Sequence, residues 1–359
     1  MPRIKSSGPK NAKIFIIGEA PNQQDEKSGI PFTGSSGNEL QSWLNAVGIL
    51  KNDCYLTHVF MERPNNNDIK TLCISKRDHH ELKKTGEFPL THSASMAPNL
   101  YADPRITEPE LQRLYAEIES VSPNIILTLG NTAMWALFGD TGIAKKRGTI
   151  IPFIHNGTAY KVLPTYSPSA IIRQWDLRTI AIADCMKLAA ESSSADINRV
   201  MREVYVPETI PELTELVKEL LAGDGIISVD IETKNKQITC IGFSCNIHSA
   251  LVIPFYDPRK ESRSYWNQQE EILAWKIVRD ILSTRRPKLG QNFLYDLQYL
   301  WAIMHIPTYG EIHDTMLLHH SKFPELEKGL GFLGSIYCNE IAWKTMRPKG
   351  EKMETKLDE

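Results

Sequence analysis

The stretch Ile226-Ile-Ser-Val-Asp230-Ile-Glu232-Thr places two carboxylates inside an apolar, β-branched run. Such a run predicts a buried strand. Side chains two residues apart on a strand point to the same face, so Asp230 and Glu232 are expected side by side. Neighbouring like charges are costly unless a cation neutralises them, and Mg²⁺ prefers carboxylate oxygens. We therefore predict a metal site. The alternative is an edge strand with two solvated acids, which the bulky apolar residues alternating with the acids disfavour.

Length and composition indicate an ordinary globular protein. A chain of 359 residues is long enough for two domains, each with its own core. No apolar run approaches membrane-spanning length, and Met1 to Lys13 has no apolar signal core, so we expect an intracellular, cytoplasmic protein without a membrane partner. The net charge of -2 does not indicate nucleic-acid binding, although a local basic groove is compatible with it. The six cysteines include no Cys-x-x-Cys pair, so neither a zinc site nor a disulfide framework is expected.

The first half of the chain alternates expected strands and helices, with a long polar region at 63–105 between them. Glu19 follows the first strand, at the carboxyl end of a sheet, where open α/β folds bind ligands. Strands are expected at 12–17, 54–60 and 124–130, with two more after Lys145-Lys-Arg147, and helices at 38–47, 108–120, 131–138 and 183–190.

Three motifs in this half carry a resemblance. Gly18-Glu-Ala-Pro21, Gly29-Ile-Pro-Phe-Thr-Gly34 and Pro164-Thr-Tyr-Ser-Pro-Ser-Ala170 resemble, in this order, the motifs of the uracil-DNA glycosylase superfamily, most closely its family-4 type. The resemblance covers residues 14 to about 190 and implies a three-layer α/β/α domain that holds a flipped uracil in a pocket. It implies that Glu19 sits beside the attacking water and that Phe32 stacks on the base. Alone, the two residues would be a turn residue and a loop anchor.

The chain departs from the family pattern at three places. His58 stands where relatives commonly have the Asn that reads the uracil edge, and Ser167 stands where they have a His that stabilises the developing charge. A neutral, short serine cannot supply that charge. No cysteine precedes Cys54, whereas the family ligates an iron-sulfur cluster with two cysteines near the amino terminus, so no cluster is expected. We expect the fold to be kept and uracil excision to be impaired.

Other polar segments have two open interpretations. The loops Asn65-Asn-Asn67, Lys145-Lys-Arg147 and Ser167-Pro-Ser169 suit contacts with a DNA backbone, and a solvated loop is an equal alternative for each. The pairs His79-His80 and His319-His320 are interpreted as non-ligands, because adjacent residues do not face each other on a helix.

The pattern restarts after the small polar segment 191–196, so we predict two domains, 1–200 and 201–359. A short strand near Tyr205 is followed by a helix over 209–221 that Thr209 caps. The strand with the two acids comes next, then strands at 237–245 and 250–255, which predict a meander. Helices are expected at 268–282 and 293–304.

A second resemblance is carried by Asp230-Ile-Glu232, Gly290-Gln-Asn-Phe-Leu-Tyr-Asp296 and Ile312-His-Asp314. These segments resemble the DEDD superfamily of 3′-5′ exonucleases, specifically the proofreading domain of family A DNA polymerases. The resemblance implies a ribonuclease-H-like α/β domain in which Asp230, Glu232 and Asp296 hold two Mg²⁺ or Mn²⁺ ions. One ion activates a water and the other stabilises the departing 3′ oxygen.

The same resemblance assigns supporting residues. Asn292 and Tyr295 are expected to bind the substrate strand, and Asp314 to support the site from a helix start. The fourth acid of the family is missing, because Tyr337 is followed by Cys-Asn-Glu-Ile. We expect either the amino-terminal part of a longer or split bacteriophage-type polymerase, or an acid supplied by a partner chain.

Together these motifs predict a protein of DNA replication or repair. We expect metal-dependent removal of nucleotides from a DNA 3′ end, with a single strand or primer terminus as the partner and a polymerase domain or subunit completing the chain. Two alternatives remain: an active uracil-DNA glycosylase with Glu19, Phe32 and His58 in its pocket, and a non-catalytic module for DNA binding or polymerase docking.

Overall fold

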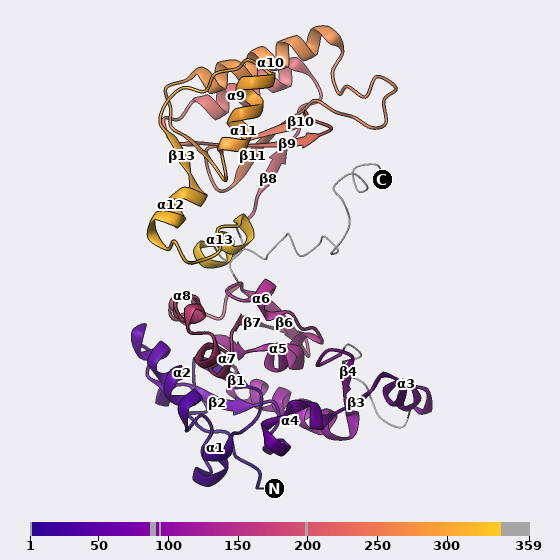
Figure 1. Ribbon diagram of the computed structural model, residues 1–359, viewed down its shortest axis with the longest axis vertical. Helices are drawn as coiled ribbons and strands as arrows, with labels where there is room; N and C mark the ends of the chain where they lie inside the picture. Colours follow the sequence, from indigo (N-terminus) through magenta and orange to yellow (C-terminus); the bar gives the residue numbers. More distant parts are fainter. Residues whose placement is uncertain (1, 87–90, 93–94, 198–199, 339–359) are drawn as a thin grey trace. The chain divides into compact units, whose positions relative to one another are not determined.

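The computed structural model describes residues 2–86, 91–92, 95–197 and 200–338 (Figure 1). Of these, residues 2–197 and 331–338 form one compact unit, and residues 200–330 form the other. Each unit is an α/β structure with its own main sheet. In the described ranges, no helix combines the length and the apolar character that a membrane crossing requires.

The main sheet of the first unit has the strand order β2-β1-β5-β7-β6. Four strands are parallel, and the edge strand β6 is antiparallel to β7. The parallel strands place their carboxyl ends at one edge of the sheet. Their bounds are β1 (Ile14–Gly18), β2 (Tyr55–His58), β5 (Ile125–Leu129) and β7 (Thr158–Thr165), with β6 at Ile151–His155.

The first sheet has a hydrophobic core on each face. Alternate residues of a strand point to opposite faces, so Phe15 and Ile17 belong to one core, whereas Ile14 and Ile16 belong to the other. The helices α4 (Pro104–Val121) and α5 (Asn131–Phe138) cover the first face, and α2 (Ser35–Ala46) and α8 (Arg178–Glu191) cover the second. This is the predicted three-layer α/β/α arrangement.

The polar region 63–105 contains structure that the hydrophobic pattern did not indicate. A two-stranded antiparallel sheet of β3 (Cys73–Ser75) and β4 (Leu100–Ala102) carries the helix α3 (Lys76–Thr85). This helix is charged nearly all round, so it lacks the apolar periodicity that predicts a helix. The short helices α1 (Gln23–Ser28), α6 (Ile143–Lys146) and α7 (Pro168–Arg173) complete the unit.

The sheet of the second unit has the order β13-β12-β9-β10-β11-β8. The strands β9, β10 and β11 form the predicted antiparallel meander, and β12 and β13 continue the sheet in parallel on the other side of β9. This is the expected ribonuclease-H-like arrangement. The bounds are β8 (Glu203–Tyr205), β9 (Ile227–Lys234), β10 (Gln237–Ser244), β11 (Ser249–Pro254), β12 (Lys288–Gly290) and β13 (Ile312–Asp314).

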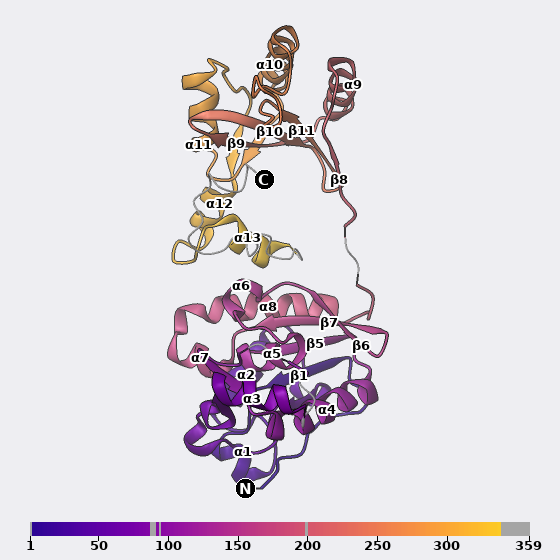
Figure 2. The same cartoon turned by 90° about the vertical axis from the view of Figure 1, so that its right-hand side faces the viewer.

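Two helices cover one face of the second sheet. Figure 2 shows α9 (Ile210–Leu221) and α10 (Gln268–Ser283) on this face, where they pack on the apolar side of β9. Thr209 caps α9 through the backbone N–H of Glu212, as predicted. The remaining helices of this unit are α11 (Leu294–Gln298), which continues as a π-helical turn at Tyr299–Ile303, and α12 (Thr315–Lys322). The helix α13 (Leu330–Tyr337) belongs to the first unit from Gly331 on.

Candidate functional site

Asp230 and Glu232 lie on the exposed face of β9. Burial alternates along this strand, with Ile227, Val229 and Ile231 buried and the acids exposed between them. The strand is central, since it pairs with β10 on one side and β12 on the other. The alternative of an edge strand is therefore wrong. The two carboxylates stand on the same face, as the period of two requires.

Asp296 joins this pair through the backbone of β9. The Ile227 N–H donates to the Pro287 carbonyl on the β12 side, so the Ile231 N–H, four residues on, points to the same side. Pairing with β12 involves only Ile227 and Ser228 of β9. The Asp296 Oδ1 accepts the Ile231 N–H at 2.9 Å. A carboxylate of α11 thus contacts the strand midway between the two acids.

Burial raises the pKa of Asp296. This carboxyl is 4% exposed. Loss of hydration raises its pKa to about 6, the Ile231 N–H opposes the rise, and the charges of Asp230 and Asp314 add to it. Negative charge is therefore concentrated where a cation is expected.

The neighbouring residues fix the geometry around Asp296. Asp314 caps α12 through the Met316 N–H, and it also accepts the backbone N–H groups of Asn292 and Phe293. Asp314 thus stands at a helix start, as predicted, and its supporting role at the site stays a prediction. Asn292 is exposed and has a left-handed backbone with φ of 54°. The Tyr295 hydroxyl lies 2.7 Å from the Thr233 hydroxyl.

The three carboxylates fit a divalent ion by donor type, because Mg²⁺ and Mn²⁺ take carboxylate oxygens. Within the described residues, however, no group of three or more His, Cys, Asp and Glu side chains is arranged to hold a metal ion. One Asp296 oxygen accepts the Ile231 N–H. The three predicted carboxylates thus lie in the same region of the second unit, but they are not arranged as ligands of one metal ion. The segment after Tyr337, on which the missing fourth acid depends, lies outside the described residues.

In the first unit, His58 at the end of β2 lies against Phe32, which stands between α1 and α2 and close to Gly18 at the end of β1. Their ring centroids are 4.4 Å apart with an interplanar angle of 32°. A Cβ added to Gly18 would lie 2.6 Å from His58 Nδ1 and 2.7 Å from Phe32 Cζ, so only glycine fits there. The Phe32 ring expected to stack on a base is thus in contact with His58 and is only 5% exposed.

His58 faces a buried acid that the sequence analysis missed. Its Nε2 lies 3.6 Å from Asp25 Oδ2, and neither ring nitrogen has a hydrogen-bond partner among the described residues. Burial opposes ionisation of Asp25, but the proximity of His58 and the N–H and hydroxyl donors of Asn22 and Thr33 outweigh it, so the pKa of Asp25 lies below its usual value. The capping box Asn22-Gln-Gln-Asp25 was the available signal for this buried carboxylate.

The remaining predicted residues of this unit lie nearby in the fold. Glu19 accepts the Thr132 hydroxyl at 2.5 Å, at the start of α5. Ser167 caps α7 through the Ala170 N–H, which is a structural role for this hydroxyl.

The prediction that Arg147 contacts a DNA backbone from a surface loop is wrong. Arg147 is buried and pairs with Asp184, with Nε 2.9 Å from Oδ2, so it is not a surface group for a DNA backbone. Of the histidine pairs, His79 and His319 are buried, and neither pair contributes to a metal cluster in the part of the chain that the structure describes.

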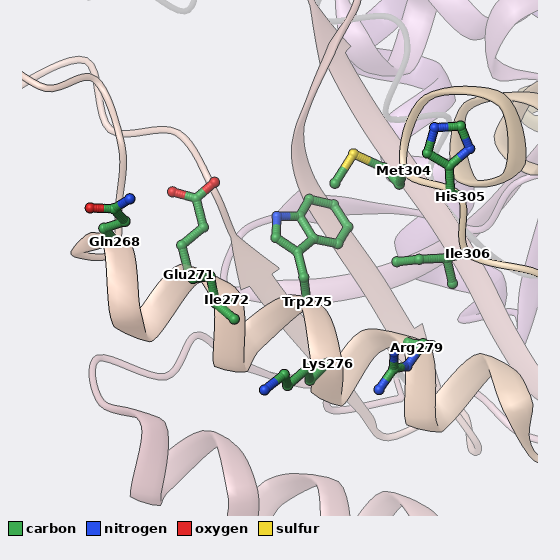
Figure 3. Close-up of a pocket in the computed structure, with 9 residues that line it drawn as sticks. All are labelled: Gln268, Glu271, Ile272, Trp275, Lys276, Arg279, Met304, His305 and Ile306. Atoms are coloured by element: carbon green, nitrogen blue, oxygen red, sulfur yellow. The ribbon is translucent and has the colours of Figure 1, made fainter.

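A groove of about 530 Å³ runs along α10 (Figure 3). None of the predicted site residues lines it. The Trp275 indole stands at its middle, near Met304, and it stacks on Phe255 with ring centroids 3.8 Å apart. The lining residues are Gln268, Glu271, Ile272, Trp275, Lys276, Arg279, Met304, His305 and Ile306.

Comparison with known families addresses the first unit directly. Residues 5–188 match the family model of the uracil DNA glycosylase superfamily. This chain belongs to that superfamily. Its superfamily region is similar to the type-4 uracil-DNA glycosylase of Archaeoglobus fulgidus, which is 26% identical over 190 residues, 52% of this chain and 79% of the relative.

A second similarity covers both units of this superfamily member. It is 24% identical over 347 residues to a DNA polymerase of Bacillus phage SP01, which covers 88% of this chain but 33% of the polymerase. The chain thus spans about one third of that relative. Among solved structures, RNase D of Escherichia coli aligns at 14% identity with a TM-score of 0.30, over 44% of this chain and 39% of that chain. The predicted resemblances to the glycosylase superfamily and to a phage polymerase are confirmed.

Proposed function

We propose that this chain is the glycosylase-like and exonuclease part of a phage-type family A DNA polymerase, and that its second unit removes nucleotides from DNA 3′ ends. The similarity to the phage polymerase runs through both units and supports this assignment. The observation that supports it most directly is the hydrogen bond from the Ile231 N–H to Asp296. This bond brings a third carboxylate to the strand that bears Asp230 and Glu232.

The protein residues have separable roles in this proposal. Asp230, Glu232 and Asp296 would hold divalent ions, Mg²⁺ or Mn²⁺, and these would supply the activation of a water and charge stabilisation for the departing oxygen. Asp314 positions the segment before α11 by accepting the Asn292 and Phe293 N–H groups. Asn292, whose N–H donates to Asp314, and the partly exposed Tyr295, whose hydroxyl lies 2.7 Å from that of Thr233, are proposed to bind the 3′-terminal nucleotides.

For the first unit we propose DNA binding without efficient uracil excision. The observation that favours this is the tilted contact of the His58 ring with Phe32, the ring that is expected to stack on the base and is only 5% exposed here. Ser167 supplies no positive charge to a departing base, and its hydroxyl accepts the Ala170 N–H at the start of α7.

The test uses a 5′-labelled DNA single strand with one internal uracil, incubated with Mg²⁺, Mn²⁺ or EDTA and resolved with and without alkali. We expect a shortening ladder only with the divalent ions, and loss of the ladder in Asp230→Ala. Asp280→Ala is the matched control, because it removes an exposed acid from α10.

The outcomes separate the two units. No ladder with either ion, or an undiminished ladder in Asp230→Ala, would overturn the exonuclease assignment. An alkali-dependent break at the uracil that survives EDTA would establish excision and overturn the proposed role of the first unit.

A further inference from the structure

The helix α3 presents basic side chains on one face. Lys76, His80 and Lys83 follow an i, i+4, i+7 spacing, which places neighbouring side chains about 5–6 Å apart on one side of the helix. All three are exposed, as is Arg77 beside them. With His79 and Tyr101 these residues line a groove of about 630 Å³, and no acid lines it. We call these six residues the α3 groove.

The two acids of α3 have partners within the helix and its cap. The Ser75 hydroxyl donates to Asp78 at 2.8 Å, and Glu81 pairs with Lys84 at 3.4 Å. No carboxylate partner is found for Lys76, Arg77 or Lys83 among the described residues. The positive charge of the groove is therefore uncompensated on the side that faces solvent.

The groove is held in place by an aromatic contact. The buried His79 ring stacks on Tyr101 of β4, with centroids 4.5 Å apart. Burial lowers the pKa of His79, and the charges of Lys83 and His80 lower it further, so the neutral ring is favoured in the stack. This contact anchors a helix whose other residues gain little from burial. In Figure 1, α3 lies at the edge of the first unit, on the other side from α2.

We infer that the α3 groove binds the phosphate backbone of a nucleic-acid strand, with Lys76, Arg77 and Lys83 as the phosphate contacts. The inference rests on the proposed function in taking DNA as the ligand, and it adds a site away from the base pocket. A backbone carries one phosphate for each nucleotide, so several cations gathered at one groove suit it, and such contacts are independent of sequence. Apart from Tyr101, the residues that line the groove are lysine, arginine and histidine, which suits an anionic ligand.

The decisive comparison is between two adjacent lysines. Lys83→Gln removes a groove cation, whereas Lys84→Gln removes the same charge from a lysine that already pairs with Glu81. Affinity of the full chain for a fluorescein-labelled DNA single strand is measured by anisotropy in EDTA over a range of salt concentrations. One lost phosphate contact lowers the slope of log K against log salt by about 0.7, or about fivefold in affinity at 0.1 M relative to 1 M salt.

We expect this loss in Lys83→Gln and none in Lys84→Gln. The triple variant Lys76→Gln, Arg77→Gln, Lys83→Gln should lower the slope by about 2, which is about 100-fold in affinity over the same salt range. Circular dichroism checks that the variants fold.

Three results would overturn the inference. If the wild type binds DNA and Lys83→Gln equals Lys84→Gln, the groove is not a phosphate site while the proposed function stands. If the wild type binds no DNA, the proposed function fails with it. If polyglutamate blocks the groove as well as DNA does, the ligand is an acidic polypeptide instead.

Discussion

Replacing Asp296 by Asn is expected to stabilise the second unit at pH 8 while it removes a proposed metal ligand. Burial, together with the charges of Asp230 and Asp314, raises the pKa of Asp296 from 3.8 to about 6. Because the folded pKa lies above the unfolded one, the stabilisation from this group is complete below the unfolded value and is lost as pH rises through about 6. Above that pH the folded protein holds a charge that the unfolded chain hydrates better.

The magnitude follows from the two pKa values. Their difference corresponds to about 3 kcal/mol of destabilisation at pH 8. Asn is neutral, has nearly the same shape, and keeps an oxygen that can accept the Ile231 N–H. The hydrogen bond to the neutral Asn oxygen should be weaker by about 1 kcal/mol than the one to the charged carboxylate. The variant should therefore be more stable by about 2 kcal/mol at pH 8, and this gain should vanish towards pH 4.

Urea unfolding in EDTA at several pH values measures this effect, and hydrogen exchange of peptides from β9 assigns the transition to the second unit. Asp280→Asn is the control, because the same chemical change on the exposed face of α10 should alter stability by less than about 0.5 kcal/mol. Mg²⁺ in place of EDTA should stabilise the wild type and reduce the difference in unfolding free energy between it and Asp296→Asn. A variant less stable at pH 8, or a difference that does not change with pH, would refute the reasoning.

Two further predictions concern the first unit. Asp184→Ala leaves the buried Arg147 guanidinium without its carboxylate and removes the acceptor of the Thr165 hydroxyl. Urea unfolding should therefore show a loss of about 3–5 kcal/mol in the free energy of unfolding. A loss below about 1 kcal/mol would contradict the buried ion pair. His58→Asn should uncover the Phe32 ring. Free uracil at ten times its Kd should then raise the melting temperature of the variant, and not of the wild type, by about 3–6 °C. Equal responses of the two proteins would show that His58 does not close the pocket.

Local rules explain why most elements could be predicted. Alternating burial along β9, the Thr209 cap of α9 and the meander β9-β10-β11 all follow from residue periodicity and capping chemistry. The helix α3 escaped prediction because its residues are nearly all polar, and its anchor is a contact of His79 with a strand more than twenty residues away.

The sequence by itself determined which face of β9 carries the acids and the order in which Asp230, Glu232 and Asp296 occur. Only the tertiary structure decided where Asp296 meets the strand. The pairing of β12 with β9 ends before Ile231, so the Ile231 N–H is left to donate to Asp296. The tertiary structure likewise decided that His58 lies between Phe32 and Asp25, and that Arg147 is internal rather than a surface cation. These outcomes depend on contacts between distant segments, and periodicity within one segment carries no information about them.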